Sequence, residues 1–392
     1  MTDTGRPTTA RAVALPLDRR IDQMLVRKMR RRAESTGPYR SQGLDDLARR
    51  LDGFVRRRVG DAFSLRDLRP LAGGSSKEQV AFTLVTPLEY GGEECRRLVL
   101  RLQPDESFVE TDRLREFQVI RSLAGVVPVP EAWAVDPDGS ELGQPGLVSA
   151  FVPGVTSPPR EGAYRSQQGF GERYRTLLAP QFLAHAATLA AHRWKAGQLP
   201  AFDPVAAGTN EAVLRSIHWW KRVWEEDTLA RNPLITLASH WLLDNAPVVD
   251  TVSIVHGDLR GGNFLFDPDT GVINAILDWE LAHLGDRHED LAFLLNPLFL
   301  EAEPDGREYV GGLFERDVFL AEYERLSGLP VDPVRLDYYA VFTNWRSAVM
   351  ATGTAPRCVV GRKTPQDIRV AWTANSSAVA LHMLSRTLEE VL

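Results

Sequence analysis

Hydrophobic and polar positions alternate in short runs over the first part of the chain and recur at helical spacing over most of the remainder. Residues 81–88 (AFTLVTPL) and 96–104 (RRLVLRLQP) predict two strands joined at the turn-like segment EYGGEE. Residues 111–125 predict one helix that stops at Gly125, and 131–154 predict two more strands around a polar turn. The stretch from about 44 to 150 is therefore expected to be a small, mostly antiparallel sheet with one helix.

From about residue 155 onward, helical spacing dominates the apolar pattern. The exception is 252–278, where VSIV, NFLF and GVINAILDW predict short strands around the hairpin-type turn DPDTG. A length of 392 residues also favours two lobes or domains. The expected fold class is α+β, with a small β-rich part followed by a large helical part. The helical segments expected in that part are 179–197, 210–227, 332–353 and 364–392.

Composition narrows the class of protein. The apolar fraction of 44 % and the charged fraction of 25 % are typical of a globular protein. A formal charge of −6 argues against nucleic acid as the main partner, because phosphate contacts need a basic surface. Two cysteines provide no disulfide framework and favour a reducing compartment. With no apolar run long enough for a membrane span and no secretory signal pattern after Met1, we expect a cytoplasmic protein.

The N-terminal segment differs from the rest of the chain. Residues 1–32 hold nine basic side chains and three acidic ones, and Ile21, Met24 and Leu25 have helical spacing. This pattern predicts a short helix with a basic face. Contact with a membrane surface or an anionic partner is one interpretation. We favour the other, a solvated helix that packs one edge on the body, because charge runs usually only keep a surface hydrated.

The chemistry is concentrated in HGDLRGGN, residues 256–263, which lies between two short apolar runs. Its three glycines predict a tight loop on which polar side chains converge. Asp278 ends an apolar strand, and a hairpin would bring it to the same end as Asp258 and Asn263. Two acids and an amide offer the oxygen ligands that hard cations prefer, and a nearby carboxylate can deprotonate a hydroxyl. The combination predicts phosphoryl transfer.

HGDLRGGN followed by ILDWE resembles the catalytic loop and metal motif of the aminoglycoside phosphotransferase and choline kinase-like family. The resemblance implies a bilobal protein-kinase-like fold. It implies that Asp258 is the catalytic base, with Asn263 acting beside it as a metal ligand and Asp278 as the second metal ligand. The downstream GDRHEDLA is similar as well, and implies that Asp290 ties the catalytic loop to the following helix.

The same resemblance implies a nucleotide site in the β-rich part, with ATP and Mg²⁺ as cofactors. Arg101 occupies the position of the phosphate-binding lysine, and a guanidinium can grip phosphate oxygens through two bonds. Glu116 would be its helix partner, the alternative being an exposed surface glutamate. GLVSAFVPG would be the hinge, with the backbone of Ser149 and Phe151 available for adenine. The segment LAGGSSKE is similar to the family's phosphate loop, although Gly–Ser pairs also fill ordinary turns; its candidate residues are Gly73, Gly74, Ser75 and Ser76.

We expect three regions: a basic extension (1–43), a nucleotide-binding lobe (44–152) and a helical lobe that binds the substrate (153–392). LRGGN and LDWELAHLGD most resemble kinase domains of acyl-CoA dehydrogenase-associated proteins, which implies a small alcohol, such as a hydroxyacyl compound, as acceptor. An aminoglycoside is the alternative, since 223–227 and 300–305 are acidic. A catalytically silent nucleotide-binding module is a third hypothesis, which the presence of all three motif residues disfavours. The tryptophans at 219, 220 and 224 could line an apolar pocket, although helical spacing is more often that of a core.

Overall fold

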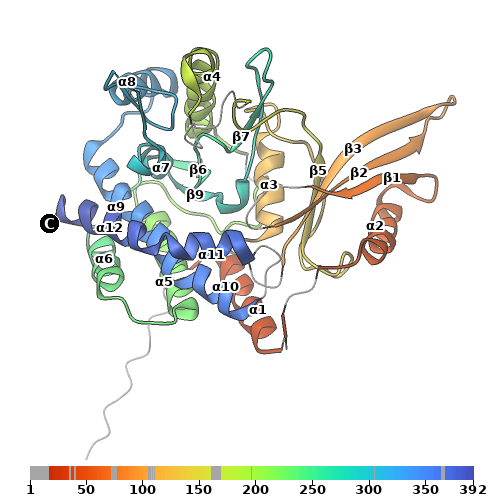
Figure 1. Cartoon of the computed structure of the whole chain (residues 1–392), viewed down its shortest axis with the longest axis horizontal. Coiled ribbons are helices and arrows are strands. Elements are labelled where there is room, and N and C mark those ends of the chain that lie inside the picture. Colours follow the sequence, from red (N-terminus) through yellow and green to blue (C-terminus); the bar gives the residue numbers. More distant parts are fainter. Residues whose placement is uncertain are drawn as a thin grey trace, which may run out of the picture.

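A five-stranded antiparallel sheet forms one side of the molecule (Figure 1). The computed structural model describes residues 17–34, 37–38, 41–71, 77–104, 107, 109, 111–159, 169–195, 197–303, 305–362 and 367–392. In β2 and β3, pairing is continuous from Glu78 opposite Leu102 to Pro87 opposite Glu93, which confirms the predicted hairpin around EYGGEE. The strands, in spatial order, are β1 (Ser64–Pro70), β2 (Glu78–Pro87), β3 (Glu93–Leu102), β5 (Gly146–Ala150) and β4 (Ala132–Asp136).

The helix α2 (Leu44–Val59) covers one face of this sheet and was not predicted. It buries Leu47, Leu51, Phe54 and Val55 against alternate residues of β2 and β3. The expectation of a strand-rich region from residue 44 was therefore wrong at its start. The four buried positions have the i, i+4, i+7, i+8 spacing of one helical face, and the sheet supplies the apolar surface that this face needs.

The helix α3 (Arg113–Leu123) lies between the sheet and the helical part (Figure 1) and confirms the predicted helix. It begins at Asp112, whose carboxylate accepts the backbone N–H groups of Leu114 and Arg115, as a good N-cap does. Its buried surface contains charged side chains as well as apolar ones. Of these, Glu116 pairs with Arg101, and Arg115 lies close to Asp18.

The rest of the chain is mostly helical, with short strand pairs, and the α+β bilobal fold is confirmed. In this part β6 (Val252–Val255) pairs with β9 (His283–Asp286), β7 (Phe264–Phe266) with β8 (Ile273–Ile276), and β10 (Glu301–Ala302) with β11 (Glu308–Tyr309). The predicted strands within 252–278 are thus present. The helices are α4 (Gly171–Ala191), α5 (Glu211–Asp227), α6 (Pro233–Asp244), α7 (His288–Leu294), α8 (Arg316–Ser327), α9 (Pro333–Val349), α10 (Ala355–Gly361), α11 (Asp367–Asn375) and α12 (Ser377–Glu389).

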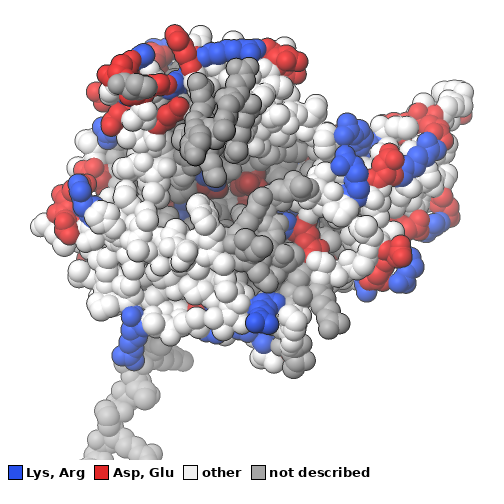
Figure 2. All heavy atoms as spheres, viewed as in Figure 1, with Lys and Arg blue, Asp and Glu red and all other residues white. Residues whose placement is uncertain are grey.

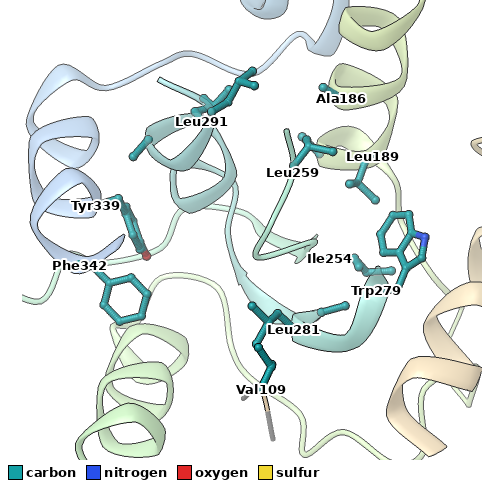
Figure 3. Close-up of a cluster of buried hydrophobic side chains, with 14 of the residues drawn as sticks. Val109, Ala186, Leu189, Ile254, Leu259, Trp279, Leu281, Leu291, Tyr339 and Phe342 are labelled. Atoms are coloured by element: carbon teal, nitrogen blue, oxygen red, sulfur yellow. The ribbon is translucent and has the colours of Figure 1, made fainter. Parts of the chain in front are cut away.

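The core of the helical part surrounds the loop 256–263. Leu259 of that loop packs in the same cluster as Ile254 of β6, Trp279 and Leu291 of α7 (Figure 3). The loop is therefore anchored by apolar burial on the side opposite its polar groups. The same core contains the buried Trp219 and Trp220, whose rings stack with centroids 5.4 Å apart, while Trp224 is half-buried. Trp219 and Trp220 are core residues, so of the three tryptophans only Trp224 could still line an apolar substrate pocket.

The helix α1 (Arg19–Glu34) confirms the predicted N-terminal helix. Ile21, Met24 and Leu25 are buried against the body of the protein, as favoured from the sequence. Its basic side chains make specific ion pairs, which are described below. Among the helices that the structure describes, none is both long enough and apolar enough to cross a membrane.

Candidate active site

The loop 256–263 is tight because two of its glycines have no room for a side chain. Gly257 has φ +82°, and a Cβ atom there would lie 2.9 Å from the Cβ of Leu281. A Cβ atom at Gly261 would lie 2.8 Å from the ring of Phe170 and 2.9 Å from the carbonyl oxygen of Gly311. Glycine is thus required both for the backbone angle and for close packing, as the sequence predicted.

Asp290 of α7 holds the beginning of this loop. Its carboxylate accepts the backbone N–H groups of His256 and Gly257, each at 2.8 Å. Burial raises the pKa of Asp290, although these hydrogen bonds oppose the shift. The buried imidazole of His256 donates from Nε2 to the carbonyl oxygen of Leu277 at 2.8 Å and so links the loop to β8. The predicted tie between the loop and the following helix is confirmed.

Asp258 and Asn263 lie side by side at the open end of the loop. The amide nitrogen of Asn263 donates to Oδ2 of Asp258 at 2.6 Å and to its carbonyl oxygen at 2.8 Å. Nε of Arg260 donates to Oδ1 of Asp258 at 3.0 Å. The carboxylate is about a quarter exposed, with a side-chain exposure of 26 %. Its orientation is therefore set by two donors while an edge remains open to a ligand.

Asp278 follows β8 and lies at the same end of the hairpin as Asn263. The N–H of Leu277 donates to the carbonyl oxygen of Asn263 at 2.8 Å, which fixes the register of the two segments. Asp278 has φ +60°, a left-handed conformation that few non-glycine residues adopt and that often marks functional sites. Oδ1 of Asp278 accepts from Nη2 of Arg101 at 2.8 Å.

The oxygen donors of Asn263 and Asp278 suit a hard cation such as Mg²⁺. The amide oxygen of Asn263 and Oδ2 of Asp278 accept no hydrogen bond from any described residue, and the side chain of Asp278 is 44 % exposed. Carboxylate and amide oxygens are the ligands that Mg²⁺ uses in proteins, usually with waters and substrate phosphates. The described residues contain no group of three or more His, Cys, Asp or Glu side chains that could hold a metal. The fit therefore rests on these two side chains together with a phosphate ligand.

Arg101 of β3 joins the sheet to the helical part. Its Nη1 donates to Oε1 of Glu116 at 2.9 Å, while its Nη2 reaches Asp278. Glu116 is fully buried and also pairs with Arg113. Burial would raise the pKa of Glu116, but the charges of Arg113 and Arg101 bring it below its usual value. Glu116 is thus the helix partner of Arg101, as expected, and not a surface glutamate. Charged atoms are visible in the hollow between the two parts of the molecule (Figure 2).

Two charged residues at this site were not predicted. Lys77, at the start of β2, is buried and donates to Oγ of Ser107 at 2.6 Å and to the carbonyl oxygen of Val109 at 2.8 Å. Its Nζ also lies 3.7 Å from Oε2 of Glu280, and Nη2 of Arg101 lies 3.9 Å from the same oxygen. Burial raises the pKa of Glu280, while Lys77 and Arg101 oppose the shift. Lys77 lies in the motif LAGGSSKE and Glu280 in ILDWE, so their positions in these motifs could have marked both as candidate site residues.

The phosphate-loop residues Gly73, Gly74, Ser75 and Ser76 lie outside the described residues. The hinge is described and differs in one respect from expectation. Ser149 is buried in β5, paired with Val99 on one side and Ala132 on the other. The N–H of Phe151 donates to the carbonyl oxygen of Arg97 at 2.9 Å, because the β3–β5 ladder continues one residue past the strand. That N–H is therefore not available for adenine; that other backbone groups of the hinge bind adenine stays a prediction.

A cavity of about 240 Å³ lies beside the loop 256–263. Phe170, Phe299 and Pro158 give it apolar surface, and Arg260 is its charged side chain. The guanidinium of Arg260 lies 5.3 Å from the ring of Phe299. The remaining lining residues are Thr156, Ser157, Gly261, Gly262 and Gly311.

The two acidic segments considered as an aminoglycoside site are paired within the protein. In 300–305, Arg175 pairs with Glu303 and lies 3.8 Å from Glu301, and Arg307 pairs with Asp305 at 2.8 Å. In 223–227, Glu225, Glu226 and Asp227 pair with basic residues of α5 and α1. Neither segment presents convergent unpaired carboxylates, so neither supplies what a polycationic acceptor needs.

The model of the phosphotransferase enzyme family matches residues 67–329. The chain belongs to this phosphotransferase family. The resemblance inferred from HGDLRGGN and ILDWE is thereby confirmed. The match includes Arg101, Glu116, Asp258, Asn263 and Asp278 and leaves α1 and α2 outside.

Individual proteins resemble this chain in sequence, and solved structures resemble it in fold. The Arabidopsis thaliana protein named probable acyl-CoA dehydrogenase IBR3 is 26 % identical over 299 residues, covering 69 % of this chain and 34 % of its own length. The chain thus spans about a third of the length of that relative. A solved structure from Ralstonia eutropha, a candidate aminoglycoside phosphotransferase, has TM-score 0.62 and 23 % identity, covering 87 % of this chain and 98 % of its own. A mutant of aminoglycoside phosphotransferase APH(4)-Ia, with ADP and hygromycin B, has TM-score 0.53 and 16 % identity, covering 86 % and 98 %.

Proposed function

We propose that this protein is an ATP- and Mg²⁺-dependent kinase that transfers the γ-phosphoryl group to a hydroxyl of a small molecule. The observation that carries the proposal is the placement of Asp258, which Asn263 and Arg260 hold at the same hairpin end as Asp278. The neighbouring loop residues Arg260, Gly261 and Gly262 line a cavity. Membership of the phosphotransferase family supports the reaction class. The complex of an APH(4)-Ia mutant with ADP and hygromycin B supports a nucleotide and a small-molecule acceptor in this fold.

In this mechanism Asp258 accepts the proton of the acceptor hydroxyl and orients its oxygen toward the γ-phosphorus. A new oxygen–phosphorus bond forms as the bond to the leaving ADP oxygen breaks. Asn263 and Arg260 fix the carboxylate in the required orientation, which lowers the entropy cost of alignment. Arg101, itself fixed by Glu116, binds phosphate oxygens of the nucleotide. A Mg²⁺ ion on Asn263 and Asp278 would neutralise charge on the β- and γ-phosphates.

We propose a hydroxyacyl compound or related small alcohol as acceptor in preference to an aminoglycoside. The cavity next to the loop 256–263 combines aromatic surface with the cation Arg260, which suits a partly apolar or anionic molecule and opposes a polycation. The acidic segments 223–227 and 300–305 are neutralised by basic partners. The acyl-CoA dehydrogenase name carried by a relative of the chain points in the same direction.

A screen of hydroxyacyl compounds and aminoglycosides for ATP-dependent phosphate transfer tests this function. Asp258→Asn should lower turnover by about 10²- to 10⁴-fold while ATP binding is retained, because a general base contributes that factor. Asp269→Asn, an exposed position in the β7–β8 turn, is the matched control and should leave turnover unchanged. Near-wild-type turnover of Asp258→Asn would contradict the assigned base.

The screen also separates the alternatives. Phosphorylation of kanamycin-type compounds with no transfer to any hydroxyacyl compound would refute the acceptor class and leave the kinase activity standing. ATP binding with no transfer to any tested acceptor, in the wild type, would favour the catalytically silent module.

A further inference from the structure

The helix α1 is fixed to the helical part through a buried carboxylate. Asp227, at the end of α5, accepts hydrogen bonds from Nζ of Lys28 at 2.8 Å and from Nη2 of Arg32 at 2.8 Å. Oγ1 of Thr354 donates to the same carboxylate at 3.0 Å. The side chain of Asp227 is buried, and a buried charge that loses its partners costs several kcal/mol. The second half of α1 is therefore held on the helical part (Figure 1).

Other basic residues of α1 reach across to α3. Nε of Arg20 donates to Oδ1 of Asp112 at 2.8 Å, and Nη2 of Arg27 lies 3.5 Å from Oδ2. Near the start of α1, Asp18 lies 3.3 Å from Nη1 of Arg115. Asp112 is the N-cap of α3, and its side chain is buried. The same carboxylate thus caps α3 and receives two arginines from α1.

The helix α3 in turn carries the group that orients Arg101. Glu116 lies one turn after Asp112, and its carboxylate accepts hydrogen bonds from Arg101 and Arg113. A shift or tilt at the beginning of α3 would move Glu116 and, with it, the guanidinium of Arg101. The contacts therefore form a connected series from the helical part, through α1 and Asp112, to Arg101.

We propose that α1 sets the position of α3 relative to the helical part and thereby sets nucleotide affinity, with Arg20, Arg27 and Asp112 as positioning residues. This inference rests on the proposed function, because the affected affinity is that for Mg-ATP. The family match at 67–329 does not include α1, so this helix is a feature of the chain beyond the matched segment. The basic face of α1 thereby acquires a specific role in addition to hydration.

The double variant Arg20→Gln/Arg27→Gln tests the proposal, with Arg19→Gln/Arg30→Gln as the matched control. Both remove two positive charges from α1, but the side chains of Arg19 and Arg30 are 75 % and 70 % exposed and do not contact α3. Asp112→Asn is the second variant, since asparagine is an equally good N-cap but carries no charge. It separates loss of the ion pairs from loss of the cap.

Hydrogen exchange of the nucleotide-free protein is the first measurement. We expect the amides of α3 to exchange faster in Arg20→Gln/Arg27→Gln and in Asp112→Asn than in the wild type or the control, while those of α4 do not change. The second measurement is steady-state kinetics. We expect KM for ATP to rise at least about fivefold, the lower end of typical coupling between sites, with a smaller change in kcat. Arg20→Lys/Arg27→Lys should restore most of the affinity.

A Glu116→Gln background shows whether the effect passes through α3. In that background the loss of Arg20 and Arg27 should change ATP affinity much less than in the wild type, because the connection to Arg101 is already broken. Equal effects in the two backgrounds would overturn the proposal. So would unchanged α3 exchange, or faster α3 exchange with unchanged KM.

Failure of the proposed function would look different. A wild-type protein that binds no Mg-ATP would refute the kinase assignment, and the exchange measurement would still decide whether α1 holds α3 in place.

Discussion

Replacing Asp290 by alanine should destabilise the protein by a magnitude that follows from two hydrogen bonds. The carboxylate accepts the N–H groups of His256 and Gly257 in a buried environment, and alanine would leave both donors unsatisfied. Each buried unsatisfied donor costs about 1–3 kcal/mol, so the two together cost about 2–6 kcal/mol. Burial already raises the pKa of Asp290, so removing the carboxyl group relieves part of a desolvation cost. We therefore expect a loss of about 2–4 kcal/mol.

Asp290→Asn should have an intermediate effect. In the wild type each N–H faces a different carboxylate oxygen. In asparagine the amide oxygen would replace one of these acceptors, and the NH₂ group would face the other donor. Denaturant unfolding with linear extrapolation measures both losses, and Asp317→Ala, at an exposed position of α8, is the control expected to stay within about 0.5 kcal/mol. If Asp290→Ala lowers the free energy of unfolding by less than about 1 kcal/mol, these two hydrogen bonds do not anchor the loop. An Asp290→Asn protein no more stable than Asp290→Ala would refute the view that one amide stays satisfied.

Three further outcomes follow from the geometry. Asp278→Ala should abolish the Mg²⁺-dependent gain in ATP affinity; calorimetry showing the same gain as wild type would contradict the metal role. Hydrogen bonds from Arg58 and Arg57 hold the pKa of Glu141 at about 2, below its usual 4.5. The folded state therefore gains about 1 kcal/mol of stability above pH 4.5, and this gain should be lost as the pH falls from 4.5 to 2. Glu141→Gln should flatten that part of the stability curve, and an unchanged curve would argue against the shift. Gly257→Ala should destabilise by about 1–3 kcal/mol more than Gly60→Ala, which has the same φ of +82° but open space around it; equal losses would exclude the steric cause.

The local geometry of the site could be predicted from the sequence. His256, Asp258, Asn263 and Asp278 fall within 23 consecutive residues, so their relative placement depends on one loop and one hairpin. Glycines, turn residues and strand periodicity specify such short-range structure directly. The same local information was present for α2 and was misjudged, since Leu47, Leu51, Phe54 and Val55 already have the spacing of a helical face. That error was one of interpretation.

Which charges meet across the two parts of the molecule could not be predicted from the sequence and follows from the packing of distant elements. Arg101 and Asp278 are 177 residues apart, and Lys28 and Asp227 are 199 apart. The family resemblance supplied an expectation for Glu116, but nothing in the sequence indicated the partners of Lys77 or of the arginines of α1.

The physical reason is that a periodic pattern reports which face of an element is apolar, and that depends on neighbours in the chain. The partner of a charged side chain depends on how separate elements pack and on how much water they exclude. Nine basic residues in the first 32 could therefore indicate a hydrated surface, while the fold directs Arg20 and Arg27 to one buried carboxylate, Asp112, and Lys28 and Arg32 to another, Asp227.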